Sequence, residues 1–198
     1  MKTLLIISAV LVLFAVGLTA VWVFVVQNVE TPAYRVLRAE GRMELRAYPA
    51  LVRAEIDRSG PRRQALSAGF GPLAGYIFAR EREGPKIAMT APVRQAAGAL
   101  GTWTVGFILP AGLSPAEAPA PARADLRLTE VPAHAAAAIR FPGHPSDADL
   151  AARERELRAW LVATDVNVTG PAAYAYYNDP FTPGFLRRNE VILPIAEP

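Results

Sequence analysis

The feature of this sequence that most constrains its fold is a recurrence of landmark residues at a spacing of 83 to 84 positions. A unit of that length buries too little apolar surface to be stable alone, so two copies are expected to pack together. We therefore predict two similar units related by a pseudo-two-fold axis, with chance coincidence as the alternative. The paired landmarks are Pro49 and Pro132, Ile56 and Ile139, and Gly60 and Gly143, each 83 positions apart (132 − 49 = 83), and Leu109 and Leu193, which are 84 apart.

In each unit, strand-like runs precede a helix and two further runs follow it; three such runs precede the helix in the first unit and two in the second. Short apolar runs that are rich in β-branched or aromatic residues and bounded by Gly or Pro predict strands rather than helices. In the clearest run, Trp103, Val105 and Phe107 fall on one face, as the two-residue period of a half-buried strand requires. The predicted strands are residues 34–37, 43–48, 50–56, 86–93 and 103–110 in the first unit, and residues 126–131, 133–140, 174–177 and 190–195 in the second.

The helix of the first unit follows Pro61, since proline is favoured at the start of a helix. Gly69, Gly71 and Pro72 are expected to interrupt this helical stretch, because glycine and proline are the strongest local breakers. We therefore predict two helical pieces, of which the second is residues 73–78.

The helix of the second unit has a clear start. Ser146 caps it, Asp149 stands in the position of a capping box, and the helix runs to about residue 162. Leucines at helical spacing predict an apolar face, and opposite charges four residues apart predict ion pairs on the exposed side. These residues are Leu150, Leu157 and Leu161 for the face, and Asp149 with Arg153 and Glu154 with Arg158 for the pairs.

A Pro/Ala-rich connector without a periodic face, residues 111–125, separates the two units. The first unit then covers residues 34–110 and the second residues 126–195. Antiparallel strands with helices packed on one side are typical of the α+β class. We predict a curved antiparallel sheet or distorted β-barrel, built from two ββαββ units with two main helices against it.

Composition excludes several kinds of site. The chain has 198 residues, enough for one ordinary domain and its appendages, and a formal charge of +3 does not indicate a nucleic-acid-binding protein. No cysteine is present, which excludes disulfides, thiolate catalysis and cysteine-ligated metal. The two histidines, His134 and His144, are too few for a three-histidine zinc site, and we predict that neither ligates a metal.

Residues 4–26 form an uninterrupted, uncharged apolar run. As a helix the run is about 34 Å long, which is enough to cross the hydrocarbon core of a bilayer. A signal peptide is the alternative, but its hydrophobic region is usually only about 7 to 15 residues long. We predict a single-pass membrane anchor over residues 1–28 and a folded domain over residues 29–198. Because Lys2 precedes the run, we expect that domain on the periplasmic or extracytoplasmic side.

Four groups of residues, in chain order, span nearly all of the chain after the apolar run. The groups are Val29-Glu30-Thr31-Pro32 with Tyr34, residues 70–78 (FGPLAGYIF), residues 86–93 (KIAMTAPV), and Asp179-Pro180-Phe181-Thr182-Pro183 with Arg187-Arg188-Asn189-Glu190-Val191. Together they resemble the SOUL haem-binding protein family. The resemblance implies a distorted β-barrel built from a tandem repeat and related to the effector-binding modules of bacterial multidrug-sensing regulators. It also implies an apolar surface cleft that binds haem or another tetrapyrrole.

By this resemblance, the cleft lies between the helical piece of residues 73–78 and the loop of residues 179–188. A flat porphyrin needs broad apolar surfaces above and below it and a few cations at its propionate edge. The alternatives are ordinary core packing for the apolar residues and a solvated or turn-ordering charge pair for the arginines. The predicted walls are Leu73, Tyr76, Ile77, Phe181 and Phe185 with Met89 nearby, and the predicted propionate partners are Arg187 and Arg188.

Two positions depart from the family pattern. The histidine proposed as an axial ligand in some members aligns with Ala47, and a late-loop lysine of some members is replaced by Pro183. The resemblance therefore implies haem bound as a ligand, without an axial histidine and without a catalytic metal. Iron coordination through Tyr76, Tyr176 or Met89 is the remaining route, since haem proteins use such ligands.

Two other functions stay open. Glu190 matches a pocket glutamate of the related effector-binding modules, and beside an aromatic residue such as Tyr176 it would hold an amphipathic cation. The same two residues resemble the pair with which some related modules hydrolyse small electrophiles. The plainer alternative is an ion pair of Glu190 with Arg187 or Arg188 that only orders the turn. No Ser-His-Asp set, paired-carboxylate motif or Gly-rich phosphate loop indicates an enzyme.

Overall fold

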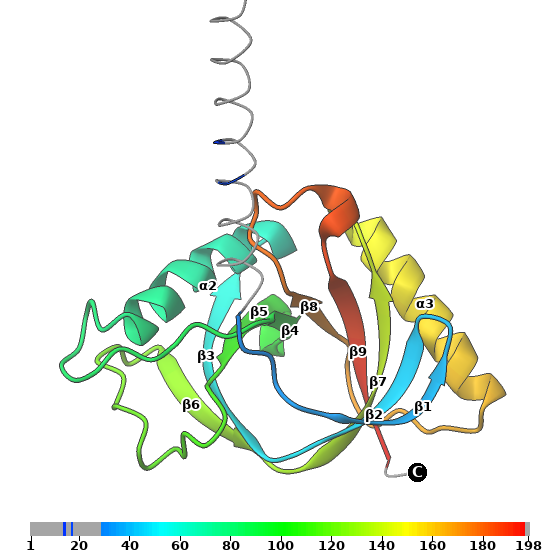
Figure 1. Ribbon diagram of the computed structural model, residues 1–198, viewed down its shortest axis with the longest axis horizontal. Helices are drawn as coiled ribbons and strands as arrows, with labels where there is room; N and C mark the ends of the chain where they lie inside the picture. Colours follow the sequence, from blue (N-terminus) through cyan, green and yellow to red (C-terminus); the bar gives the residue numbers. More distant parts are fainter. Residues whose placement is uncertain (1–13, 15–16, 18–28, 197–198) are drawn as a thin grey trace, which may run out of the picture.

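The structure is a computed structural model that describes Phe14, Gly17 and residues 29–196. Its strands form one nine-stranded antiparallel sheet and two α-helices pack against it, which confirms the predicted α+β class (Figure 1). The elements are β1 (Arg35–Glu40), β2 (Met43–Tyr48), β3 (Leu51–Ser59), α2 (Arg62–Ile77), β4 (Val93–Ala97), the 3-10 turn η1 (Ala99–Gly101), β5 (Thr102–Ile108), β6 (Leu126–Val131), β7 (His134–Phe141), α3 (Asp147–Ala163), β8 (Ala173–Tyr176), the 3-10 turn η2 (Gly184–Leu186) and β9 (Asn189–Ile195).

The predicted membrane-spanning run, residues 4–26, lies outside the described residues except for Phe14 and Gly17. Among the residues that the structure describes, no helix has the length and apolar character needed to span a bilayer. The anchor therefore stays a prediction.

The order of the strands across the sheet follows the repeat. After β1 the chain runs β-β-α-β-β twice. Across the sheet the order is β1-β2-β7-β9-β8-β4-β5-β3-β6. The equivalent strands of the two units are β2 and β6, β3 and β7, β4 and β8, and β5 and β9. If β1 is left out, exchanging these equivalents and reading the order backwards gives the same order again. β4 and β8 meet at the centre, while β2 pairs with β7 and β6 with β3, so each unit places its first strand beside a strand of the other.

The sheet is open at both ends. In the described part of the chain, β1 pairs only with β2 and β6 pairs only with β3, and no ladder joins these two edge strands. Of the predicted alternatives, a curved antiparallel sheet or a distorted β-barrel, the barrel is therefore not confirmed. β1 is an additional strand ahead of the first unit, and its hairpin with β2 occupies the free edge of β2.

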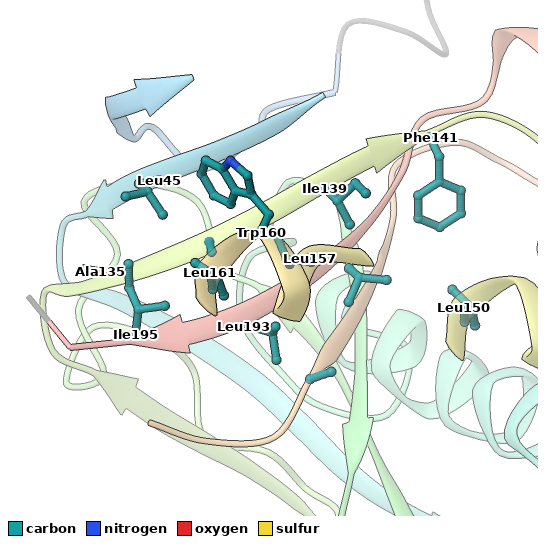
Figure 2. Close-up of a cluster of buried hydrophobic side chains, with 13 residues drawn as sticks. Leu45, Ala135, Ile139, Phe141, Leu150, Leu157, Trp160, Leu161, Leu193 and Ile195 are labelled. Atoms are coloured by element: carbon teal, nitrogen blue, oxygen red, sulfur yellow. The ribbon is translucent and has the colours of Figure 1, made fainter. Parts of the chain in front are cut away.

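Both helices cover the same face of the sheet, called the helix face below, and each covers one half of it (Figure 1). Leu157 and Leu161 of α3 pack on β2, β7 and β9 in a cluster that includes Leu45, Ile139 and Leu193 (Figure 2). On the other half, α2 packs on β3 and β5 in a separate cluster. Two apolar cores, one per helix, therefore stabilise a single continuous sheet.

Helix α3 is the helix that the sequence predicted most closely. It has Ser146 as its N-cap, and Asp149 completes a capping box. Leu150 is buried with Leu157 and Leu161, as predicted, and Glu154 pairs with Arg158 at 2.8 Å. The predicted pair of Asp149 with Arg153 is wrong, because the Asp149 carboxylate binds the Ser146 hydroxyl and amide and Arg153 pairs with Glu156 instead.

Helix α2 is continuous from Arg62 to Ile77, so the predicted break at Gly69, Gly71 and Pro72 is wrong. Pro72 has no N–H to donate to the carbonyl of Ala68, and Arg58 of β3 donates its Nε to that oxygen at 3.3 Å instead. Gly69 lets the helix approach the sheet, because a Cβ at this position would lie 2.7 Å from Cβ of Val105. The helix thus accommodates Gly69 and Pro72 and continues past both residues.

Residues 86–93 do not form the predicted strand. Their backbone groups bind other partners: Ile87 N–H donates to the carbonyl of Ile77, Ala91 N–H donates to Glu30, and Thr90 bridges Glu30. Pro92, after a cis peptide bond, has no N–H for a ladder. The strand starts only at Val93 and continues to Ala97 as β4, which pairs with β5 and β8.

Candidate functional site

A cleft of about 650 Å³ opens on the helix face, and it is called the α2 cleft below. Its walls come from the first half of α2, the segment before β4, and the segment that follows β8. A volume of this size is typical of small-molecule sites. The lining residues are Val29, Arg62, Arg63, Leu66, Ser67, Phe70, Met89, Thr90, Ala91, Val93, His144, Pro145, Tyr176, Tyr177, Asn178, Asp179, Pro180, Arg187 and Asn189.

The apolar part of the cleft is built by α2 and the segment before β4. Leu66 and Phe70 stand one turn apart on α2 and face Met89 and Val93 across the opening. Phe70 is 42% exposed, while the edge of its ring packs against Phe107 of the core at 5.3 Å between centroids. The core thus holds Phe70 in place and leaves part of its ring to the cleft.

Arg62, at the start of α2, contacts both the start of α3 and the end of β8. It is only 4% exposed, and it donates through Nε to Asp147 Oδ1 at 2.5 Å and through Nη1 to the Tyr176 hydroxyl at 2.6 Å. Its Nη2 is buried and makes no hydrogen bond to the described residues. Burial raises the pKa of Tyr176 to about 12, with the Arg62 charge acting in the opposite direction. Tyr176 is therefore a neutral phenol at physiological pH, and Arg62 keeps one unfilled donor at the cleft.

The loop after β8 contributes a second arginine. Arg187 donates through Nη1 to the Asp179 carbonyl at 3.0 Å, and its Nε is buried without a hydrogen bond to the described residues. Asp179 orders this loop, because its carboxylate accepts from the Phe181 amide and the Thr182 hydroxyl. Burial lowers the pKa of the Arg187 guanidinium, with the Asp179 charge acting in the opposite direction. An anion beside Arg187 would fill its free donor.

Other polar groups at the cleft also keep free hydrogen-bonding capacity. Oδ1 of Asn189 is buried without a hydrogen bond to the described residues. Arg63 is exposed, donates only to the Pro145 carbonyl at 3.3 Å, and pairs with no carboxylate of the described residues. His144 is exposed, and its ring makes no hydrogen bond to them. Gly184 leaves room for this ring, since a Cβ there would lie 3.2 Å from Cδ2 of His144.

Of the residues predicted for the tetrapyrrole site, Met89 and Arg187 line the cleft, and Tyr176 of the alternative pocket lines it as well. Leu73, Tyr76 and Ile77 lie in the second half of α2 and are buried in the core against β3 and β5. The resemblance thus indicated the helix that lines the cleft, but these three side chains point into the protein. Because these three side chains pack against the sheet, their apolar surface is not accessible to a ligand.

Phe181 and Phe185 are 86% and 80% exposed, and neither lines the α2 cleft. The structure therefore places both predicted walls on the outer side of the loop. Arg188 binds Glu190 at 2.8 Å and does not reach the cleft. This contact is the plainer alternative that the sequence left open, an ion pair at the start of the last strand.

Glu190 lies in a buried network on the face of the sheet opposite the helices. It is fully buried and accepts from Arg46 at 2.7 and 3.0 Å, from Arg188 at 2.8 Å and from the Tyr177 hydroxyl at 2.8 Å. Burial opposes ionisation, yet the hydrogen bonds and charges of the two arginines outweigh it and hold the pKa of Glu190 below its usual value.

Tyr176 and Glu190 are not brought together. Tyr176 pairs with Asn189 while Glu190 pairs with Ala175, so the two side chains point to opposite faces of the sheet. The hydrolytic pair required these two residues side by side, and the pocket for an amphipathic cation required Glu190 to face an aromatic residue such as Tyr176. With its charge already satisfied by arginines, Glu190 is available for neither role.

Sequence reasoning missed Arg62, Leu66, Phe70 and the position of His144. The spacing of the first three, at i, i+4 and i+8 of one helix, was present in the sequence and marks one side of α2. It was overlooked because the helix was predicted to break. Nothing in the sequence alone indicated that His144, over 70 residues after Phe70, would line the same cleft.

Comparisons with known proteins agree with this architecture. The C-terminal domain of EcmrR has a TM-score of 0.59 at 12% identity, with 83% of this chain and 99% of that chain covered. A hydrolase from Listeria innocua has a TM-score of 0.57 at 11% identity, with 81% and 94% covered. EcmrR in complex with DNA has a TM-score of 0.58 at 11% identity, with 79% and 57% covered. At such identities the likeness shows the fold alone, and no curated protein sequence matches the chain.

A family model gives the more specific result. The model described as SOUL heme-binding protein matches residues 29–194, which include both repeats and every residue that lines the α2 cleft. The protein therefore belongs to the SOUL haem-binding protein family.

Proposed function

We propose that the α2 cleft binds haem or a related tetrapyrrole and that the protein serves as a carrier, buffer or sensor of that ligand. The observation that supports this best is the combination of an apolar opening of about 650 Å³ with two buried arginine donors, on Arg62 and Arg187, that lack partners among the described residues. The family match to haem-binding proteins supports the same ligand class.

The side chains of the cleft fit the two parts of a tetrapyrrole. Leu66, Phe70 and Met89 offer apolar surface to the macrocycle, and the flexible thioether of Met89 adapts to its edge. Arg63 and Arg187 would hold the propionates, because guanidinium groups form charge-assisted hydrogen bonds with carboxylates. Haem, when bound, supplies a redox-active iron.

His144 is the side chain of the cleft that we assign to the iron. The sequence predicted that it is no ligand, but the structure places its exposed imidazole on the cleft beside Gly184. Proximal histidine is a common haem ligand. Tyr176 is less suited, because its hydroxyl already accepts from Arg62 and burial raises its pKa to about 12.

A hemin titration of the full chain in detergent, with protein-free micelles as the blank, tests the proposal. We expect a saturable shift of the Soret band at micromolar hemin. Arg63→Glu should weaken binding at least about tenfold, because it replaces an unpaired cation with a repelling anion. Arg155→Glu is the matched control, since Arg155 is an exposed arginine of α3 far from the cleft lining. A linear, unsaturable signal, or equal loss in both variants, would remove the proposal.

We also propose that residues 4–26 anchor the protein in a membrane, with the domain on the extracytoplasmic side. The apolar length of this run and the preceding Lys2 support the anchor and its orientation. Alkaline carbonate extraction should leave the chain in the membrane pellet, and protease added to spheroplasts should digest the domain. Release into the supernatant would argue for a cleaved signal peptide.

A further inference from the structure

A second cavity lies on the face of the sheet opposite the helices. Its volume is about 290 Å³, and it spans the centre of the sheet, where β4 and β8 meet. The volume is close to the lower end of the usual range for small-molecule sites. The lining residues are Pro32, Tyr48, Leu51, Arg53, Pro92, Arg94, Ile108, Val131, His134, Ala136, Ala175, Tyr177, Ile192 and Pro194.

Most of these lining groups are apolar, and the uncharged polar side chains already have partners. The Tyr48 hydroxyl accepts from Arg46, and the Tyr177 hydroxyl donates to Glu190. His134 contacts the Pro132 carbonyl through Nδ1 at 2.9 Å and stacks on Tyr48 with 5.3 Å between ring centroids. The charged groups that line the cavity are its two arginines, Arg53 and Arg94.

Arg94 has no counterion among the described residues. It pairs across the ladder with Gly106, and Gly106 pairs on its other side with Glu55. Glu55 leans over the bare glycine, since a Cβ at 106 would lie 3.2 Å from Cγ of Glu55, but its oxygens bind Arg53 and Thr129. No carboxylate of the described residues comes within 4.0 Å of the Arg94 guanidinium. A cation thus faces the centre of the sheet without a partner.

Arg53 adds a second donor to the same cavity. Its Nε lies 3.2 Å from Oε1 of Glu55 in a salt bridge, yet this nitrogen is buried and makes no hydrogen bond to the residues that the structure describes. Burial lowers the pKa of Arg94 to about 10, which still leaves the guanidinium charged at physiological pH. Among the described residues, Arg94 has no carboxylate partner and Arg53 has only Glu55, so the cavity is suited to an anion.

We propose that this cavity binds a small monocarboxylate with an apolar body. The carboxylate lies between Arg94 and Arg53, where it accepts from donors that the protein leaves open. The apolar body lies against Ile108, Ile192 and the rings of Tyr48 and Tyr177. Tyr177 lines both this cavity and the α2 cleft, but the two sites lie on different faces of the sheet, because Arg94 lies on one face while Val93 and α2 lie on the other.

Isothermal titration calorimetry of the full chain with three probes of one shape tests the charge requirement. Benzoate, benzyl alcohol and benzylamine share a ring but carry a negative, no and a positive charge at neutral pH. We expect saturable binding of benzoate, at least tenfold weaker binding of benzyl alcohol, and no saturable binding of benzylamine. Equal binding of the neutral and anionic probes would overturn the proposal.

Variants of Arg94 test the residue itself. Arg94→Gln should weaken benzoate binding at least tenfold, and Arg94→Lys should recover part of that loss because it restores the charge. Since Arg94 has no partner among the described residues, neither change should lower the thermal midpoint of unfolding appreciably. Unchanged benzoate binding in Arg94→Gln would contradict the assignment.

The outcome is independent of haem binding. Arg94→Gln should bind hemin as the unmodified chain does, and Arg63→Glu should bind benzoate as the unmodified chain does. Loss of hemin binding together with intact benzoate binding would remove only the proposed function of the α2 cleft. Competition between hemin and benzoate would instead place both ligands in one site and reject the second site.

Discussion

At the scale of single residues, the most consequential contact is that of Glu190 with Arg46 and Arg188. The carboxylate is fully buried, and Arg46 is 2% exposed. Removing one member of a buried charge network costs far more than an exposed pair contributes, because the remaining charge loses both water and partner. The arginines that neutralise Glu190 therefore depend on it in turn.

We predict that Glu190→Gln destabilises the protein by about 3 to 5 kcal/mol, since it leaves the buried Arg46 and the half-buried Arg188 with a neutral amide. Urea unfolding followed by far-ultraviolet circular dichroism measures this loss. Glu130→Gln is the control, because Glu130 is an exposed carboxylate of β6 without a salt bridge in the described part of the chain. Losses of similar size in the two variants would contradict the role of the network.

The same carboxylate predicts a pH dependence. Because the pKa of Glu190 is held below its usual 4.5 in the folded state, its contribution is present at neutral pH and is lost as the pH falls through the lowered folded value. The free energy of unfolding of the unmodified chain should therefore fall more steeply below about pH 4.5 than that of Glu190→Gln. Parallel curves over the acidic range would argue against a lowered pKa.

A second residue-scale prediction concerns the two histidines. His144→Ala should change the Soret and visible bands of the hemin complex, because it removes the ligand that we assign to the iron. His134→Ala is the matched control, since His134 lines the cavity on the opposite face. Metal-free protoporphyrin IX should bind both variants equally. Identical hemin spectra in the two variants would exclude His144 as the ligand.

Individual residue roles were the part of the site that sequence reasoning predicted least. Met89 and Arg187 were assigned to the cleft and line it, whereas Tyr76 is buried and Arg188 points to the other face. The reason is physical: a shift of one position along a strand moves a side chain to the other face of a sheet. Arg187 and Arg188 are neighbours in sequence and have different partners for this reason.

At the scale of elements, α2 shows how a helix can contain two breakers and gain from them. Gly69 permits close approach to Val105, and Arg58 replaces the donor that Pro72 lacks. Local sequence rules predicted a break here because they contain neither the facing strand nor Arg58. Helix α3, by contrast, has its capping box and its leucine face within its own sequence, and its bounds were predicted closely.

Two glycines of α2, Gly69 and Gly71, differ in the space around them, and this difference gives an element-scale prediction. Gly69→Ala should destabilise the protein by about 1 to 3 kcal/mol, because its Cβ would overlap Val105 in a packed core. Gly71→Ala should instead stabilise it by about 0.5 to 1 kcal/mol, since nothing lies within 4 Å of the added Cβ and alanine favours the helix. Urea titrations of the two variants decide this; a stabilising Gly69→Ala would show that α2 is not pressed against β5.

At the scale of the whole molecule, two cores share one sheet, so we predict that they unfold together. Leu73→Ala in one core and Leu157→Ala in the other should each cost about 2 to 5 kcal/mol, as expected for fully buried leucines. Each variant should still show one transition that coincides for far-ultraviolet circular dichroism and for tryptophan fluorescence. A separate early transition in either variant would show that the halves unfold independently.

The overall architecture was predictable to the extent that it is repeated. The spacing of 83 residues between Pro49 and Pro132 indicated two units, and eight of the nine strands lie close to the predicted ranges. The order across the sheet was not predictable, because it depends on which edges of the two units meet. β4 was missed because the apolar residues before it bind the N-terminal segment and the end of α2.

The exchange of first strands between the units determines how the chain can be divided. β2 pairs with β7, and β6 pairs with β3. A cut in residues 111–125 would therefore separate both pairs, and in each fragment the strands of these pairs would lose a neighbour that only the other fragment supplies. Two such fragments, made as separate polypeptides, should be insoluble alone and should reconstitute the domain when mixed. The same exchange of strands would allow two intact copies to swap their units, which gives this fold a direct route from a monomer to a domain-swapped dimer.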